Sequence, residues 1–101
     1  MPSAGAHVVE WDMGLDHREF FRLLPAALAG YRHHTTPTSI AVELDDADSR
    51  LTIDLGPVGE RRIALLRIPT TKVTFSFENC SAEATKAFLA RFEGHYRRGG
   101  G

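Results

Sequence analysis

The chain has 101 residues, of which 43% are hydrophobic and 25% are charged. This length fits a single domain, and these fractions are ordinary for a globular protein that buries a core. Twelve basic and thirteen acidic residues give a formal net charge of −1. The chain therefore lacks the positive field that supplies most non-specific affinity for nucleic acids, and a nucleic-acid partner is not expected.

The first predicted element is a short strand over residues 7–12, in which Val9 and Trp11 face the same side. A helix is predicted to follow, because Asp16 can cap its first turn and Glu19 stands three residues later, as in a capping box. Apolar residues at helical spacing follow the cap: Phe20, Phe21, Leu24, Ala27 and Leu28. Pro25 predicts a kink or a break in this helix, and Gly30 is expected to stop it.

Four more strands are predicted, over residues 38–45, 50–55, 61–68 and 71–78. Three of these runs alternate apolar and polar residues, as strands do when one face meets a core. Turns are expected over residues 46–49, 56–59 and 69–70, and such short connections make neighbouring strands antiparallel. Residues 31–37 are expected to form a polar connection without a strand.

A second helix is predicted after Ser81, which is a sound N-cap. Its apolar stripe is Ala84, Thr85, Phe88, Leu89, Phe92 and Tyr96. The inward side chains Leu44, Ile53 and Phe75 are expected to share one interior with Phe88 and Phe92.

This order of elements predicts an α+β domain of two layers, a mainly antiparallel five-stranded sheet (β-α-β-β-β-β-α) with two helices on one face. One domain is expected over residues 1–101, with flexible ends at 1–6 and 98–101. The order of elements resembles a single repeat of the TATA-binding-protein fold. This resemblance is one of topology over nearly the whole chain, and it would imply a sheet face that binds DNA only by analogy.

The side chains expected on the outer sheet face do not suit DNA. Minor-groove binding by a sheet needs cationic side chains around apolar wedges. Acids slightly outnumber bases on this face and no aromatic residue is present, as its members show: Glu43, Asp45, Arg50, Thr52, Asp54, Lys72, Thr74, Ser76 and Glu78.

The predicted strand over residues 61–68 is apolar on both faces. If Ile63 and Leu65 point to the helices, then Ala64, Leu66 and Ile68 emerge on the polar face; the opposite phase exposes Ile63 and Leu65 instead. Either phase places aliphatic side chains where water is expected. A local bulge or a neighbouring segment would explain this, and so would a docking patch formed by Ala64, Leu66 and Ile68.

No motif for catalysis, for a cofactor or for a metal rises above background. The five histidines and Cys80 are scattered, and His33 and His34 are adjacent, so their side chains diverge in extended backbone. We therefore predict no catalytic residue, no cofactor and no metal ligand, and leave open whether the protein is an enzyme.

The favoured hypothesis is a protein-interaction or dimerisation module, or an accessory subunit, whose partner is a protein or a second copy. The alternative is a small-ligand binder with a cleft between the helices and the sheet, near Trp11, Phe21, Tyr31, His33 and His34. One cysteine cannot form an internal disulfide, no run of ~20 apolar residues could cross a membrane, and no secretory signal is seen. A cytoplasmic location without membrane attachment is therefore expected.

Overall fold

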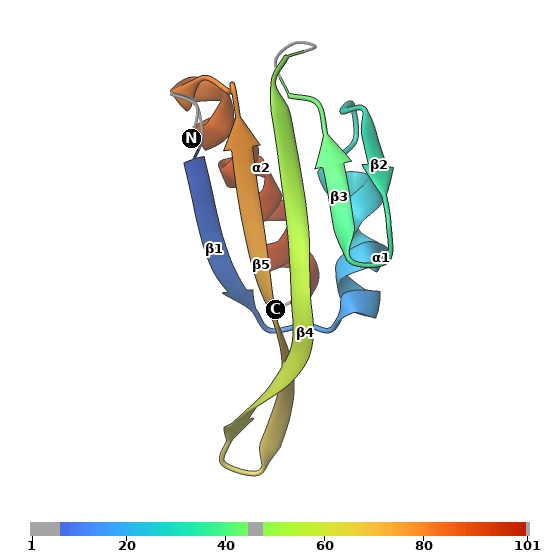
Figure 1. The fold of residues 1–101 in the computed structure, drawn as a ribbon. Coiled ribbons are helices and arrows are strands. Elements are labelled where there is room, and N and C mark those ends of the chain that lie inside the picture. Colours follow the sequence, from blue (N-terminus) through green and yellow to red (C-terminus); the bar gives the residue numbers. More distant parts are fainter. Residues whose placement is uncertain (1–6, 45–47, 101) are drawn as a thin grey trace.

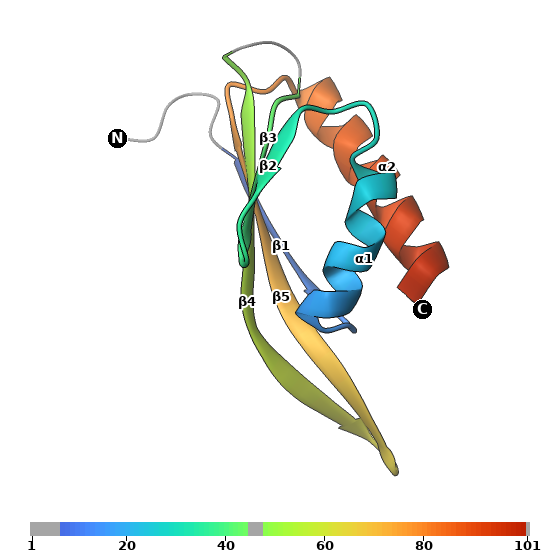
Figure 2. The same cartoon turned by 90° about the vertical axis from the view of Figure 1, so that its right-hand side faces the viewer.

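The computed structural model describes residues 7–44 and 48–100 of the chain. Its elements are β1 (His7–Met13), α1 (His17–Ala27), β2 (His33–Thr35), β3 (Ser39–Val42), β4 (Arg50–Ile63), β5 (Leu66–Glu78) and α2 (Ala82–Gly100). The strands form one antiparallel sheet in the order β1-β5-β4-β3-β2 (Figure 1). Both helices lie on the same face of this sheet, as Figure 2 shows from the side. The predicted α+β fold with five strands and two helices is confirmed.

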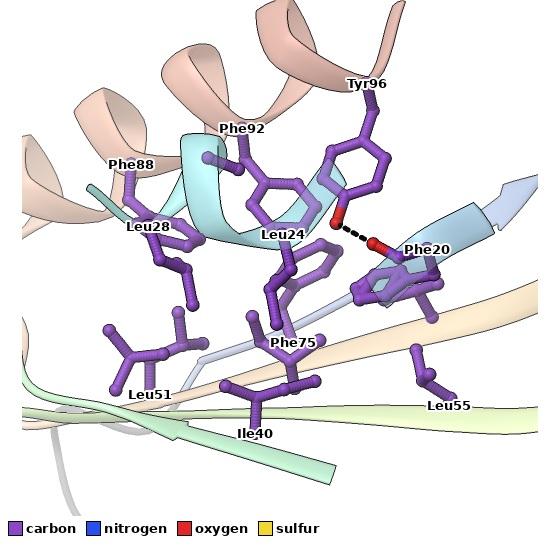
Figure 3. Packing of buried hydrophobic residues seen from close by; sticks show 14 of the residues in the cluster. Phe20, Leu24, Leu28, Ile40, Leu51, Leu55, Phe75, Phe88, Phe92 and Tyr96 are labelled. Atoms are coloured by element: carbon purple, nitrogen blue, oxygen red, sulfur yellow. Dashed lines mark hydrogen bonds between the residues drawn. The ribbon is translucent and has the colours of Figure 1, made fainter. Parts of the chain in front are cut away.

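The core fills the space between the helices and the sheet (Figure 3). Phe75 of β5 lies at its centre, with the Trp11 ring 4.9 Å and the Phe92 ring 5.2 Å away, both edge-on. Ile53, Phe75, Phe88 and Phe92 are buried, and Leu44 is half-buried against them. The interior expected from period-two and helical spacing is therefore the one that forms.

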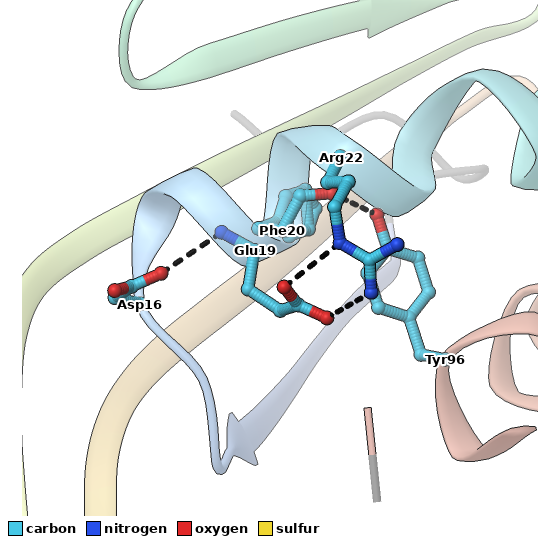
Figure 4. Close-up of polar contacts among 5 residues, drawn as sticks. All are labelled: Asp16, Glu19, Phe20, Arg22 and Tyr96. Atoms are coloured by element: carbon cyan, nitrogen blue, oxygen red, sulfur yellow. Dashed lines mark hydrogen bonds and ion pairs between the residues drawn. The ribbon is translucent and has the colours of Figure 1, made fainter. Parts of the chain in front are cut away.

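The start of α1 follows the predicted cap. Oδ1 of Asp16 accepts a 2.8 Å hydrogen bond from the backbone N–H of Glu19 (Figure 4). The carboxylate of Glu19 does not close a capping box; it pairs with Arg22 one turn on, and this hydrogen bond lowers the pKa of Glu19. Of the kink or break predicted at Pro25, the break is wrong, because α1 continues through Pro25 to Ala27.

The two helices are joined by polar contacts as well as by the core. The Tyr96 hydroxyl of α2 donates a 2.8 Å hydrogen bond to the backbone carbonyl of Phe20 in α1 (Figure 4). Arg91 of α2 donates to the carbonyl of Ala29, just beyond the end of α1, over 2.6 Å. Since α1 has no basic residue in its own last turn, Arg91 supplies the cation that favours a helix C-terminus.

The predicted N-cap of α2 is also confirmed. The Ser81 hydroxyl oxygen accepts a 3.0 Å hydrogen bond from the backbone N–H of Ala84. The backbone of α2 runs to Gly100, so residues 98–100 are helical where a flexible end was expected. The other residues of the expected flexible ends, 1–6 and 101, lie outside the described residues.

The strand boundaries differ from the prediction. Residues 56–59, expected to turn the chain, lie inside β4, where Gly56 and Pro57 form a bulge and Val58 and Gly59 pair with β5. Residues 69–70, also expected to be a turn, lie inside β5. The predicted strand over residues 61–68 is therefore wrong as a unit, since the chain reverses at its middle. The fifth strand is instead β2, which forms within the segment 31–37 expected to be a connection.

Candidate functional site

The ends of β4 and β5 extend past the rest of the sheet as a two-stranded ribbon, here called the arm (residues 58–71). Its cross-strand pairs run from Val58 with Thr71 to Ile63 with Leu66. β1 ends opposite Thr71, at the base of the arm, and β3 begins opposite Asp54, so neither neighbouring strand pairs with residues 58–70. Figures 1 and 2 show the arm projecting from the two-layer body and curving toward the side of the helices.

Local features explain how the sheet continues into the arm. Gly56 and Pro57 together oppose Lys72, and such an extra residue in one strand bends and twists a ribbon. Proline is tolerated at bulges and in strands without an outer neighbour, which is where Pro57 and Pro69 lie. At the base of the arm, the buried Thr71 hydroxyl donates a 2.8 Å hydrogen bond to the carbonyl of Leu15. This bond ties the arm to the loop before α1.

The tip of the arm is a two-residue turn made by Ala64 and Leu65. The φ angle of Ala64 is +55°, and hairpin turns of this length need such left-handed backbone. Ile63 and Leu66, which flank the turn, pair directly and therefore share a face of the ribbon. The same alternation adds Arg61 and Ile68 to this face, and the opposite face carries Glu60, Pro69, Arg62 and Arg67.

Exposed aliphatic side chains of the described residues gather on the arm. Five large hydrophobic side chains are exposed, and four of them lie between residues 58 and 66: Val58, Ile63, Leu65 and Leu66. Leu65 is 99% exposed. Scattered single exposed apolar residues are ordinary, whereas three of them, Ile63, Leu65 and Leu66, gathered at the end of a projecting hairpin form an exposed apolar patch.

The arm is also basic. It carries three arginines and one glutamate, which gives a net charge of +2. Arg62 lies 3.6 Å from the carboxylate of Glu60, while Arg61 and Arg67 form no ion pair with any residue that the structure describes. The aliphatic tip is thus bordered by two arginines that no described carboxylate pairs with.

The three residues predicted to form a docking patch all lie on the arm. Leu66 is exposed beside the turn, Ala64 is exposed within it, and Ile68 is half-buried at the base with a methyl group beside Gly14. The prediction missed Arg61 and Arg67 as part of this surface. The arginines on either side of an unbroken aliphatic run were the available signal.

A second feature is a hollow of about 780 Å³ on the sheet face that the helices leave open. It lies over β2, β3 and the start of β4, and is lined by Tyr31, Arg32, His33, His34, Ala41, Val42, Glu43, Arg50 and Thr52. Ala41 pairs with His34 on one side and with Thr52 on the other. Of these three paired residues, Ala41 has the smallest side chain, and its methyl group leaves the floor of the hollow open.

The residues predicted to hold a small ligand divide into two groups. Tyr31, His33 and His34 all line the hollow, although the Tyr31 ring itself packs on Phe88 of α2. Trp11 instead packs on Phe75 in the core, and Phe21 is half-buried beside the Phe20 ring. The structure therefore does not bring the five residues together.

The described residues contain no group of three or more histidine, cysteine, aspartate or glutamate side chains placed to hold a metal ion. The Cys80 thiol lies 3.3 Å from the carbonyl of Glu78 and 3.6 Å from that of Arg50. Burial raises the pKa of the Tyr96 hydroxyl, which serves the contact between the helices. Among the described helices, none has the length and apolar character needed to cross a membrane.

Comparison of the chain with protein-family models, with curated proteins and with solved structures yields no match. The resemblance to a TATA-binding-protein repeat thus rests on the order of elements alone. The arm and the hollow are the two surface features from which a function can be argued.

Proposed function

We propose that this chain is a protein-interaction module, acting as an accessory subunit that docks its arm on a partner protein. The observation that carries the proposal is Leu65, which is 99% exposed in the turn at the end of the arm. A side chain of this kind contributes about 1.5–3 kcal/mol when it is moved from water into an apolar site. The proposal keeps the cytoplasmic location expected from the single cysteine.

The chemistry of the arm specifies the partner. The tip is convex and apolar, so its partner offers an apolar groove, and the flanking Arg61 and Arg67 favour acidic side chains around that groove. Packing two arms against each other would instead bring the arginines of one copy against those of the other. We therefore favour a different protein over a second copy. The net charge of −1 on the whole chain disfavours a nucleic acid.

Photo-crosslinking tests this proposal directly. A photoreactive amino acid in place of Leu65 is expected to crosslink one defined partner protein in the cell of origin. The same substitution at Ala90, which is exposed on α2, is the matched control and is expected to capture none. Binding of the purified partner is expected to fall roughly tenfold or more in L65S and in R61E/R67E, and to weaken with added salt.

Three outcomes would contradict the proposal. A crosslinked product of twice the chain mass would identify a second copy, which is the homodimer also considered from the sequence. A crosslink to nucleic acid would show a different class of partner. Equal capture at positions 65 and 90, or equal partner affinity of L65S and the wild type, would show that the arm does not take part in the interaction.

A further inference from the structure

The hollow on the open sheet face is separate from the arm and has a different chemical character. Its rim is formed by two rows of side chains that run across the strands. One row is His34, Ala41 and Thr52, which pair directly. The next row is Arg32, Glu43 and Arg50. Glu43 lies beside Arg32, because its backbone N–H donates a 3.0 Å hydrogen bond to the Arg32 carbonyl. Glu43 lies beside Arg50 as well, because the residues next to them, Val42 and Leu51, pair directly.

Alternation of the strands places both rows away from the helices. Ile40, Val42, Leu51 and Ile53 are buried under the helices, so Ala41 and Thr52 between them face the other side. Arg32, His34 and Arg50 are exposed. Their side chains stand around Ala41, whose methyl group leaves the space between them unfilled.

The rim offers many hydrogen-bond donors and few acceptors. Arg32 and Arg50 each carry a guanidinium with five N–H donors, and His34 and Thr52 add further donors. Neither Arg32 nor Arg50 forms an ion pair with any described residue, including Glu43, which stands between them. Two arginines that line one hollow, with no described carboxylate bound to either, are an arrangement suited to oxyanions.

We propose that the hollow over Ala41 binds a small ligand through a phosphomonoester group. A phosphomonoester carries a charge near −2 and three terminal oxygens, which can accept from both arginines and from Thr52 at once. A carboxylate has two oxygens and one charge, and leaves part of this donor set unused. The volume of about 780 Å³ also lies within the usual range of small-ligand sites, about 300–1,000 Å³.

Titration of the full chain with inorganic phosphate, phenyl phosphate and O-phosphoserine, followed by amide chemical shifts, tests this proposal. Resonances of residues 32–34, 41–43 and 50–52 are expected to shift, and the affinity is expected to fall with added salt. A preference for phenyl phosphate would identify a phosphorylated small molecule as the source, and a preference for O-phosphoserine a phosphorylated side chain.

Four variants locate the site. R32Q and R50Q are each expected to weaken binding by about tenfold, the loss of one charge-assisted contact. A41L fills the floor of the hollow and is expected to abolish binding, while E43Q removes the one negative charge of the rim and is expected to strengthen it several-fold. R18Q, an exposed arginine outside the hollow, is the matched control and is expected to bind as the wild type does.

The proposal is overturned if none of the three probes shifts these resonances, or if R32Q and R50Q bind like R18Q. Because Arg32 and Arg50 are exposed, their variants report on the site even if A41L does not fold. Equal effects of R18Q and R32Q would show only a general response to net charge, which also overturns the assignment. None of these results bears on the arm.

Discussion

The hydroxyl of Tyr96, near the end of α2, donates a 2.8 Å hydrogen bond to the main-chain carbonyl of Phe20 in the first turn of α1. The two residues are 76 positions apart, and their rings also stack, with centroids 5.0 Å apart. This pair connects the helices at the end of the body nearer the arm. It adds a buried polar contact to the apolar packing between the helices.

Tyr96→Phe is expected to lower the free energy of unfolding by about 1 kcal/mol, because one buried hydrogen bond is lost while the ring is kept. Urea unfolding at neutral pH measures this difference. Tyr31→Phe is the matched control, since that ring packs on Phe88 without a hydrogen bond from its hydroxyl among the contacts of the described residues. A Tyr96→Phe variant as stable as the wild type would show that the hydroxyl contributes nothing.

The same tyrosine predicts a dependence on pH. Burial raises the pKa of Tyr96 in the folded chain, so the folded state holds this proton more tightly than the unfolded state does. The stabilisation is complete below the unfolded pKa of about 10, and it falls by up to ~1.4 kcal/mol per pH unit above that value. Unfolding measured between neutral and strongly alkaline pH is expected to show this loss in the wild type. The loss is expected to be smaller in Tyr96→Phe, and identical pH profiles would contradict the assignment.

Asp16→Ala is expected to destabilise the protein by about 1 kcal/mol, because the N–H of Glu19 loses its acceptor at the first turn of α1. Asp16→Asn keeps an oxygen that can accept this hydrogen bond, so it is expected to destabilise the protein by only a few tenths of the loss in Asp16→Ala. Asp54→Ala, on the open face of β4, serves as the control and is expected to change stability by less than about 0.5 kcal/mol. Thermal unfolding of the three variants checks the ranking, and equal values for Asp16→Ala and Asp54→Ala would contradict it.

Thr71→Val tests the bond that ties the arm to the body. Valine has the same shape but no hydroxyl, so the carbonyl of Leu15 loses a buried donor, and a cost of about 1–3 kcal/mol is expected. Thr74→Val, on the half-exposed face of the same strand, is expected to change stability by less than about 0.5 kcal/mol. If both valine variants unfold at the same urea concentration, the bond from Thr71 does not hold the arm.

Ala64→Gly is expected to stabilise the arm. Alanine at φ +55° carries a strain of about 1–2 kcal/mol that glycine avoids, partly offset by the greater freedom of glycine in the unfolded chain. Amide exchange in the arm is expected to slow by about fivefold. Ala87→Gly, an exposed helical position in α2, is the control and is expected to lose about 1 kcal/mol. Faster exchange in the arm of Ala64→Gly would contradict the argument.

Much of the two-layer arrangement follows from local signals. Period-two alternation marks Ile53 and Phe75 as inward, and the helical stripe marks Phe88 and Phe92 as their partners. Asp16 and Ser81 mark where the helices begin, because side-chain oxygens at those positions meet unpaired backbone N–H groups within three residues. Each of these signals acts over a few residues, and the structure follows each one.

Only the tertiary structure decides the arm and the hollow, because both depend on pairing between distant residues. Gly56 and Pro57 suit a turn as well as a bulge, and the choice is made by the pairing of β4 with β5 on both sides of them. The hollow requires Arg32, Ala41 and Arg50 to meet across three strands, including β2, whose three residues have no strand-like alternation of their own. The sequence by itself determines which side chains enter the core. Register and the ends of neighbouring strands determine which side chains stay exposed on the surface.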